Sequence, residues 1–291
     1  MKILLTGATG FLGSHLLKNF TDNNYEVIAL KRSTSNLWRI KNIKTHVTYY
    51  DVDKIKLEQI FQKNLNIDAI VHTATCYGRK SEAVLQIEKV NVLFPLEIIE
   101  LAIKYNCRYF YNTDTLLKND LNYYSISKKQ FVDWGKKFAD EQKIHFYNLK
   151  LEHMYGELDD DAKFIPYLIE QCRLNVPKIN LTTGEQKRDF IYVEDIVDIY
   201  DFLLKNEKLK KCQYEKIEIG TGKSVRVREV VSQIHLMTKS KSFLNFGEIP
   251  YRKGECMNVK VNLSKLKKLG FQTEQMIDFK EGLDRIYSRN T

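Results

Sequence analysis

The feature that most constrains this chain is a glycine-rich segment close to its first residue. The segment Thr6-Gly7-Ala8-Thr9-Gly10-Phe11-Leu12-Gly13 follows a short apolar run and opens an amphipathic stretch. A strand that passes through a glycine turn into a helix is typical of a dinucleotide site, because the first N–H groups of the helix and its dipole face the diphosphate. Gly7 permits the tight turn, Gly10 lets the backbone approach the phosphates, and Gly13 lets the helix pack on the strand. The expected contacts are Gly7, Thr9, Gly10, Phe11 and Leu12.

The rest of the first half predicts an α/β fold with a doubly wound parallel sheet, the Rossmann arrangement. Short apolar runs alternate with amphipathic stretches, and this alternation is typical of parallel strands joined by helices. The runs are apolar on both sides, as strands covered on both faces require. We expect strands at residues 2–6, 25–30, 47–50, 69–72, 108–112 and 145–151, and helices at 11–23, 81–106 (interrupted by Pro95) and 123–141.

The second half is less regular and predicts a smaller C-terminal α/β lobe for the substrate. Loops are expected at 159–161 and 182–184, strands at 190–193 and 216–219, and helices at 194–205, 225–237, 263–269 and 276–287. We therefore assign residues 1–156 and about 185–212 to a dinucleotide-binding domain. Residues of about 157–184 and 213–291 are assigned to the substrate lobe.

Composition excludes several classes of function. The chain is 43% hydrophobic and 29% charged, as an ordinary globular protein is. Its net charge of +9 suits an anionic partner, but the lysines are scattered and no nucleic-acid motif is present, so no nucleic acid is expected. The chain contains no apolar stretch of about 18 residues, so no membrane span is expected. The five cysteines form no Cys-x-x-Cys pair and the six histidines have no ligand spacing, which predicts reduced thiols, a cytoplasmic protein and no metal.

The three-residue glycine spacing resembles the extended short-chain dehydrogenase/reductase superfamily, the NAD-dependent epimerase/dehydratase family. This family contains nucleotide-sugar epimerases, dehydratases and reductases. Further segments resemble its motifs: His72-Thr73-Ala74-Thr75, Asn91, Met154-Tyr155-Gly156, Gln186-x-Arg188-Asp189-Phe190-x-x-Val193 and Arg252-x-Gly254-Glu255. The resemblance implies that Thr73, Ala74, Thr75 and Asn91 line the cofactor.

A tyrosine and a lysine four residues apart are the candidate catalytic pair. Tyr124 and Lys128 open a predicted helix, and this spacing places both side chains on one face. A free tyrosine has a pKa of about 10, and a nearby ammonium lowers the pKa of the phenol. An alternative register from Tyr123 has no lysine. In the resembled family the lysine also holds the nicotinamide ribose, and a Ser or Thr at the end of the preceding strand donates to the reacting oxygen; Thr113 fits that place, with Thr115 as the competitor.

The end of the second predicted strand bears on the choice of nicotinamide cofactor. NAD-preferring proteins place a carboxylate there, whereas this chain has Lys31, Arg32 and Ser33. Two cations and a hydroxyl suit a 2′-phosphate, so we expect NADP(H) rather than NAD(H). Asp51 and Val52 resemble the family's adenine-contacting segment.

The resemblance also bears on the reaction. Nucleotide-sugar 4,6-dehydratases carry Thr-Asp-Glu where this chain has Thr113, Asp114 and Thr115, and without the glutamate dehydration has no obvious base. The segments 75–79 and 112–115 look like the reductases that make CDP-abequose, CDP-paratose or dTDP-fucose. The expected substrate contacts are Tyr77, Arg79, Thr113, His153, Arg188 and Arg252.

These observations favour an NADPH-dependent reductase of a nucleotide-linked 4-keto-6-deoxyhexose, in deoxysugar biosynthesis for surface polysaccharide such as lipopolysaccharide. Two alternatives stay open: a 4-epimerase with tightly held NAD, and a dinucleotide-sensing regulator without turnover. The expected partners are a nucleotide-diphosphate sugar and a second copy of the chain. The family suggests that the homodimer forms through the 81–106 and 123–141 helices.

Overall fold

The structure, a computed structural model, describes residues 1–43, 46–252 and 254–289. Its chain divides into two compact units, Met1–Leu151 with Val197–Ile217, and Glu152–Ile196 with Glu218–Thr291.

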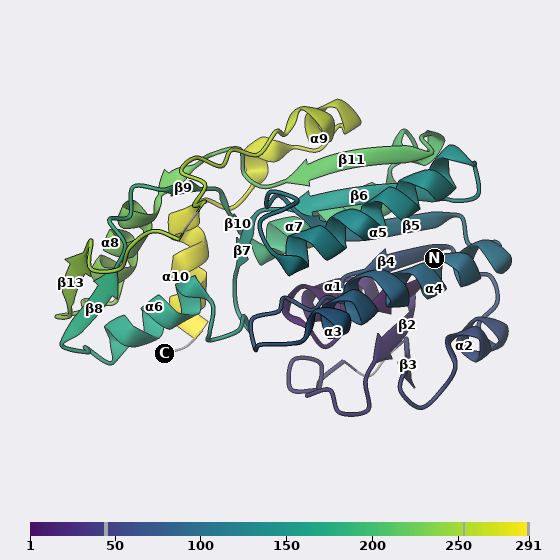
Figure 1. The fold of residues 1–291 in the computed structure, drawn as a ribbon, viewed down its shortest axis with the longest axis horizontal. Helices are drawn as coiled ribbons and strands as arrows, with labels where there is room; N and C mark the ends of the chain where they lie inside the picture. The colour runs from purple at the N-terminus through teal and green to yellow at the C-terminus, as the bar shows by residue number, and fades with distance from the viewer. Residues whose placement is uncertain (44–45, 253, 290–291) are drawn as a thin grey trace. The chain divides into compact units, whose positions relative to one another are not determined.

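The first unit contains a seven-stranded sheet, which confirms the predicted fold class (Figure 1). The strand order is β11-β6-β5-β4-β1-β2-β3, and the six strands from β6 to β3 pair in parallel. The strands are β1 (Lys2–Thr6), β2 (Glu26–Lys31), β3 (Val47–Asp51), β4 (Ala69–His72), β5 (Tyr109–Thr115), β6 (His145–Leu151) and β11 (Tyr214–Ile219).

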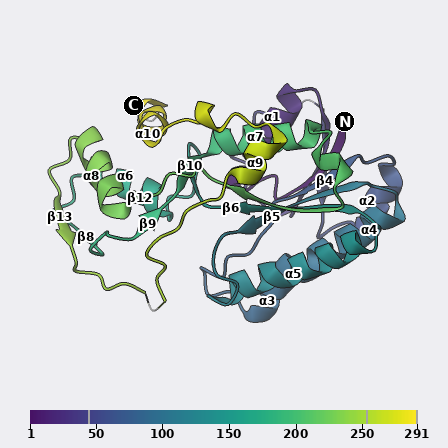
Figure 2. The ribbon, with the colours of Figure 1, turned by 90° about the horizontal axis from the view of Figure 1, so that it is seen from above.

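Helices cover both faces of this sheet. Figure 2 shows α1 and α7 on one face and α3, α4 and α5 on the other. Their bounds are α1 (Phe11–Asp22), α2 (Leu57–Lys63), α3 (Val84–Glu88), α4 (Phe94–Lys104), α5 (Tyr123–Asp140), α7 (Val193–Lys205) and the short η2 (Leu209–Lys211). On the α5 face the core is aromatic, because Phe110 of β5 and Phe146 of β6 pack against Phe131 of α5.

The predicted helix at 81–106 is wrong in detail. Residues 81–83 are not helical, and a π-helical turn, η1 (Lys89–Leu93), separates α3 from α4. Pro95 lies in the first turn of α4, directly after the π-helical turn, where the helical backbone is continuous and a proline supplies no N–H to the hydrogen-bond ladder. A mid-helix π turn is often found at functional sites, and this one contains Asn91.

The second unit is built from two-stranded sheets and helices. Its described part contains β10 paired with β7, β12 with β9, and β13 with β8. The elements are β7 (His153–Tyr155), α6 (Phe164–Arg173), β8 (Lys178–Leu181), β9 (Lys187–Arg188), β10 (Phe190–Tyr192), β12 (Val225–Arg226), α8 (Val227–Met237), β13 (Phe243–Phe246), α9 (Ser264–Leu269), η3 (Thr273–Gln275) and α10 (Phe279–Arg289). Tyr155, Leu168 and Val231 lie in its core.

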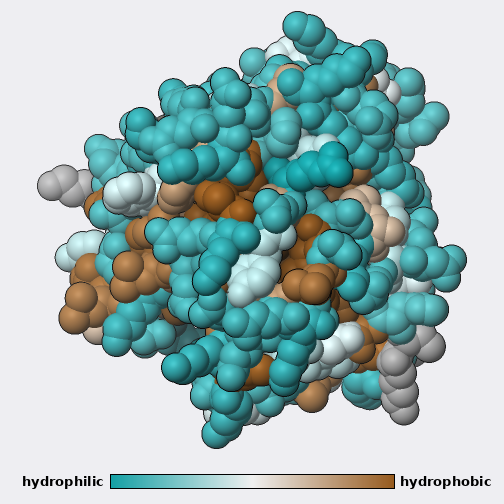
Figure 3. Space-filling view, turned by 90° about the vertical axis from the view of Figure 1, so that its right-hand side faces the viewer, coloured by the Kyte–Doolittle hydropathy of each residue, from teal (hydrophilic) through white to brown (hydrophobic). Residues whose placement is uncertain are grey.

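The chain returns to the first unit later than the predicted 185–212. Residues 187–192 pair with other strands of the second unit, and the returning segment is Val197–Ile217. In the described ranges no helix is both long and apolar enough to cross a membrane. The side of the protein on which α2 and α4 lie is mostly hydrophilic, with apolar side chains gathered in small areas (Figure 3).

Candidate functional site

The glycine turn has the geometry of an anion-binding helix start. Gly7 has a φ of +70°, and a Cβ on it would lie 2.7 Å from the Ala74 nitrogen. A Cβ on Gly13 would overlap the carbonyl oxygen of Gly7, so α1 packs on the turn only without a side chain there. Helix α1 begins after Gly10 with no side-chain cap and no acidic residue in its first turn. A helix start of this kind suits an anion, and the turn fits a dinucleotide diphosphate.

The turn is tied to the segment that leaves β4. The Thr6 hydroxyl oxygen accepts from the N–H groups of Thr73 and Ala74, each at 3.1 Å, and lies 2.8 Å from His72 Nδ1. The Thr73 hydroxyl donates to the Thr6 carbonyl at 2.7 Å. The predicted cofactor-lining segment therefore borders the glycine turn, but the hydroxyl of Thr73 is used to join the two strands.

Asn91 joins the same segment to helix α5. Its Oδ1 accepts from the Cys76 N–H at 2.7 Å and lies 3.3 Å from the Thr75 hydroxyl. Its Nδ2 lies 2.9 Å both from the Cys76 carbonyl and from Ser127 Oγ. With its amide bonded in this way and fully buried, Asn91 positions the segment that carries the predicted cofactor contacts.

Helix α5 presents the predicted catalytic pair. The helix begins at Tyr123, because Asn122 caps it by accepting from the Ser125 N–H at 2.9 Å. Tyr124 is partly buried, and Lys128 is buried. The Tyr124 ring packs against the Tyr77 ring at 5.0 Å, and the Arg79 guanidinium lies 4.7 Å above Tyr77. The structure thus brings together four of the predicted residues, two catalytic and two substrate-binding.

Burial controls the protonation of this pair. Burial raises the pKa of Tyr124 well above its usual value; Tyr77 and Asp114 raise it further, whereas Thr115 and Arg79 lower it. Burial lowers the pKa of Lys128 to about 8, and the Asp114 carboxylate opposes that change. The phenol is therefore protonated at neutral pH, and it is available as an acid.

The two candidate threonines have different partners. They lie on the same face of β5, which extends three residues beyond its predicted end. The hydroxyl of Thr113 is 2.7 Å from the hydroxyl of the buried Tyr200 in α7. The Thr115 hydroxyl oxygen accepts from the Leu117 N–H at 3.2 Å, and the Thr115 side chain lowers the pKa of Tyr124. Sequence reasoning missed Tyr200, because its helix is distant in the chain and no pattern marks it.

Carboxylates from β3 reach the end of β2. Lys31 forms an ion pair with Asp51, and Asp53 accepts from the Ser33 N–H at 2.7 Å and from its hydroxyl at 2.5 Å. These hydrogen bonds hold the pKa of Asp53 below its usual value. Arg32 is exposed. Sequence reasoning placed no carboxylate at this point, since only the register of β2 on β3 brings residues 51–53 beside 31–33.

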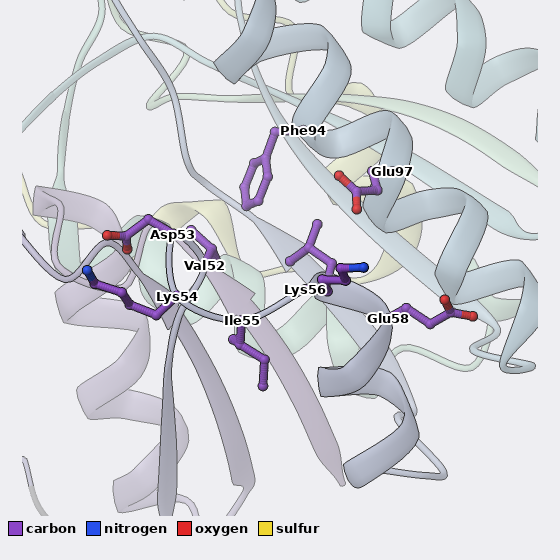
Figure 4. A pocket seen from close by; sticks show the side chains of 9 residues that line it. Val52, Asp53, Lys54, Ile55, Lys56, Glu58, Phe94 and Glu97 are labelled. Atoms are coloured by element: carbon purple, nitrogen blue, oxygen red, sulfur yellow. The ribbon is translucent and has the colours of Figure 1, made fainter.

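Val52, a predicted adenine contact, borders an open cavity of about 640 Å³ (Figure 4). The cavity lies between the connection from β3 to α2 and the first turn of α4. Its lining includes Val52, Ile55 and Phe94, with Asp53 and Glu97 among the charged members. Within the described residues no group of three or more His, Cys, Asp or Glu side chains is arranged to hold a metal ion.

Three predicted substrate contacts belong to the second unit. His153 is exposed, and its Nδ1 lies 2.5 Å from an oxygen of the buried Glu152 carboxylate. Arg188 is buried in an ion pair with Glu255 and also donates to the Cys256 carbonyl at 2.6 Å. Arg252 is exposed. The guanidinium of Arg188 thus has the internal ion pair that a structural arginine would have.

Comparisons with known proteins agree with this architecture. Residues 3–220 match the model of the NAD dependent epimerase/dehydratase family. The chain is 38% identical to CDP-abequose synthase of Salmonella muenchen, over 99% of this chain and 97% of that protein. It is 36% identical to CDP-abequose synthase of Salmonella typhimurium, with the same coverage. Among solved structures, UDP-glucose 4-epimerase of Thermotoga maritima with UDP-glucose superposes with a TM-score of 0.86 at 21% identity, over 100% of this chain and 99% of that one.

Proposed function

The chain belongs to the NAD-dependent epimerase/dehydratase family, and on that premise we propose that it is an NADPH-dependent reductase of a nucleotide-linked 4-keto-6-deoxyhexose. Its family and its relatives make it an enzyme that uses a nicotinamide dinucleotide on a nucleotide sugar. The step that we propose within that class is reduction of the sugar ketone at carbon 4. The product would serve deoxysugar biosynthesis for surface polysaccharide.

The observation that carries the proposal is the placement of Tyr124 on α5, where its ring packs on Tyr77 and the buried Lys128 follows four residues later. A reduction needs a proton donor when the substrate arrives, whereas an oxidation needs a proton acceptor. Burial and the neighbours Tyr77 and Asp114 raise the pKa of the Tyr124 phenol, so this site starts from the acid form. That state supports reduction of a ketone as the forward reaction.

The residues of this chain would act as follows. The glycine turn and the start of α1 would hold the dinucleotide diphosphate, and Lys128 the nicotinamide ribose. When bound, the reduced nicotinamide supplies a hydride to the substrate. Tyr124 would give its proton to the sugar oxygen, which becomes a hydroxyl group. Thr113 would donate a hydrogen bond to that oxygen while its own oxygen accepts from the Tyr200 hydroxyl 2.7 Å away.

The preference for NADPH rests on Arg32. Lys31 is paired with Asp51 and Ser33 with Asp53, so Arg32 is the exposed cation that we assign to the 2′-phosphate. The substrate contacts that we propose are Tyr77 and Arg79 in the first unit and His153 and Arg252 in the second. Arg188 of the second unit is also proposed, but it would have to exchange Glu255 for the substrate.

One assay tests the reductase. The protein is mixed with NADPH and a panel of nucleotide-linked 4-keto-6-deoxy sugars, and the absorbance of reduced nicotinamide is followed. Stoichiometric loss of NADPH with formation of the 4-hydroxy sugar is the expected result. Tight NADPH binding without turnover of any sugar would contradict the proposal and favour a dinucleotide-sensing regulator.

A 4-epimerase that holds NAD is the second candidate, and Asp53 is the observation that favours it. This carboxylate lies at the end of β2, held by Ser33, and a carboxylate there can accept the ribose hydroxyls of NAD. The same assay separates the two reactions. Interconversion of two 4-hydroxy sugars without net consumption of NADPH would identify the epimerase.

We further propose a homodimer and a cytoplasmic location. Exposed apolar side chains gather on α3, η1 and α5: Val84, Leu85, Leu93, Tyr123, Ile126 and Trp134. A cluster of this kind is typical of an interface. No disulfide joins the five cysteines, all of which lie among the described residues, and this supports a reducing compartment.

A further inference from the structure

Lys128 carries a positive charge that needs a partner inside the protein. The residue is only 2% exposed. A buried ammonium is unfavourable unless a counter-charge and hydrogen-bond acceptors replace the water that it has lost. Among the described residues, the carboxylate that favours the charged form of Lys128 is Asp114.

The packing of α5 on the sheet places Lys128 beside the end of β5. Phe131 of α5 lies 5.7 Å from Phe110 of β5, ring to ring. Asn112 and Asp114 share the face of Phe110, because side chains alternate along a strand. Helix α5 follows β5 and leads into the parallel strand β6, so it runs back along the sheet. This direction places Lys128, one helical turn before Phe131, on the helix that covers the face of Asn112 and Asp114, and Tyr124 one further turn toward the strand end.

Asp114 is held there by a short array of buried amides. Asn112 pairs with Asn148 across β5 and β6 and donates to its Oδ1 at 2.8 Å. Asn148 Nδ2 in turn donates to Asp114 Oδ2 at 2.9 Å. All three side chains are buried. The Oδ1 atom of Asn112 is buried and has no hydrogen-bond partner among the described residues, so it is an acceptor on the face that α5 covers.

We propose that the Asn112–Asn148–Asp114 array is a built-in site for the Lys128 ammonium, in which Asp114 supplies the counter-charge and Asn148 fixes its carboxylate. Asp114 is then a positioning residue, which acts on the reaction through Lys128 and Tyr124. The array keeps Lys128 charged before any cofactor binds. The inference rests on the proposed function only in taking Tyr124 and Lys128 as the catalytic pair.

The groups around Lys128 and Tyr124 determine the direction in which loss of the Asp114 carboxylate shifts the pKa of Lys128. The groups that act on the pair are Tyr77 and Arg79 from the segment after β4, Asp114 from β5, and His72 at the end of β4. His72 is neutral at physiological pH, because burial and the Lys128 charge hold its pKa well below the usual value. Asp114 raises the pKa of Lys128, so loss of its carboxylate must lower the pH at which Lys128 gives up its proton.

The test compares Asp114→Asn with Asp133→Asn, which removes an exposed carboxylate from α5. Lysine labelled with ¹³C at Cε is titrated by NMR in the full chain, and the Lys128 signal is assigned by its loss in Lys128→Met. We expect the titration midpoint of Lys128 to fall by about one pH unit in Asp114→Asn and to remain unchanged in Asp133→Asn. Asp114→Glu, which keeps the charge, should restore most of the shift.

The pH profile of turnover gives a second readout. If charged Lys128 is needed, turnover falls as pH rises through its pKa, and that basic limb should move to lower pH in Asp114→Asn by the same amount as the NMR midpoint. If Asp114→Asn does not fold, Asn148→Ala is used instead. This variant keeps the Asp114 carboxylate but removes the amide that holds it, so a smaller downward shift of the Lys128 midpoint is expected. An unchanged Lys128 midpoint in the folded variants would overturn the inference. Absence of turnover in the wild type, with the NMR shift as expected, would instead refute the proposed function alone.

Discussion

Two hydroxyl groups on one face of β5 have different partners, and this difference separates their expected roles. Thr113 is bonded to Tyr200, which can donate to it and leave the threonine O–H for a substrate oxygen. Thr115 accepts from the Leu117 N–H, and its side chain lowers the pKa of Tyr124, the proposed acid. We therefore expect Thr113 to donate a hydrogen bond to the substrate, and Thr115 to act on the reaction through the pKa of Tyr124.

Replacement of each threonine by valine tests this assignment. Thr113→Val removes a donor to the reacting oxygen, and we expect turnover to fall about a hundredfold. Thr115→Val removes a hydroxyl group that lowers the pKa of Tyr124, and we expect a fall of about tenfold at most. The rate of NADPH oxidation with the keto-sugar measures the turnover of both variants. A larger loss in Thr115→Val than in Thr113→Val would exchange the two roles.

Tyr124→Phe should remove the acid and little else. We expect turnover to fall by a factor of about 10² to 10⁴, because a positioned acid contributes that much. NADPH affinity, measured by fluorescence titration, should stay within about twofold. The control is Tyr123→Phe, since Tyr123 is the adjacent residue and is 61% exposed. Equal losses in the two variants would mean that the acid is another residue.

Arg32→Gln tests the choice of cofactor at the end of β2. Loss of a charge-assisted bond to the 2′-phosphate should weaken NADPH binding by about 10- to 100-fold. NADH, which lacks that phosphate, should bind as before. Lys41→Gln, an exposed cation in the same connection, is the matched control. Equal affinity of the wild type for NADH and NADPH would contradict the assignment.

Spacing within one segment could be predicted from the sequence, but pairing between segments could not. The Tyr124–Lys128 spacing and the Thr6–Gly13 turn are local, and the structure places both as expected. The partners of Lys31 and Ser33 come from β3 and the segment after it, and that of Thr113 comes from α7. Such contacts depend on the register of strands and helices that the sequence pattern does not specify.

At the scale of elements, the glycine turn is also a packing contact between α1 and β1. Gly13→Ala should lower the melting temperature and weaken NADPH binding together, because the new methyl group overlaps the Gly7 carbonyl and displaces the start of α1. Overpacking of this kind costs about 1–3 kcal/mol. Thermal melts with and without NADPH measure both effects, since a bound ligand raises the melting temperature. Lys18→Ala, on the exposed face of α1, should change neither.

The strands and helices of the first unit were largely predictable, and those of the second were not. Alternating apolar runs identify buried parallel strands such as β1 and β4, all of whose residues except Lys2 are buried. In the second unit β9 and β12 have two residues each and β7 has three, too short to show any period. Helix α6 was missed although its buried residues Ile165, Leu168, Ile169 and Cys172 have the spacing of one helix face.

At the scale of the whole molecule, we expect a partner to cover the exposed apolar face of α3, η1 and α5. Leu85 is 74% exposed on α3, and Trp134 is 52% exposed on α5. Solvation of such side chains is unfavourable, and a second copy of the same face would remove them from water. Because α5 also carries Tyr124 and Lys128, a dimer of this kind would hold the helix with the proposed catalytic pair in place.

Leu85→Glu tests the dimer. A buried, unpaired carboxylate at the centre of a two-fold interface occurs twice, so we expect the variant to be a monomer at micromolar concentration. Light scattering after size-exclusion chromatography gives the mass. Leu236→Glu is the matched control, because Leu236 is 79% exposed on α8, outside the proposed interface. A wild type that is monomeric, or an unchanged mass in Leu85→Glu, would contradict an interface on this face. If the monomer also loses turnover while its melting temperature is kept, then the interface supports the position of Tyr124 and Lys128 rather than the fold as a whole.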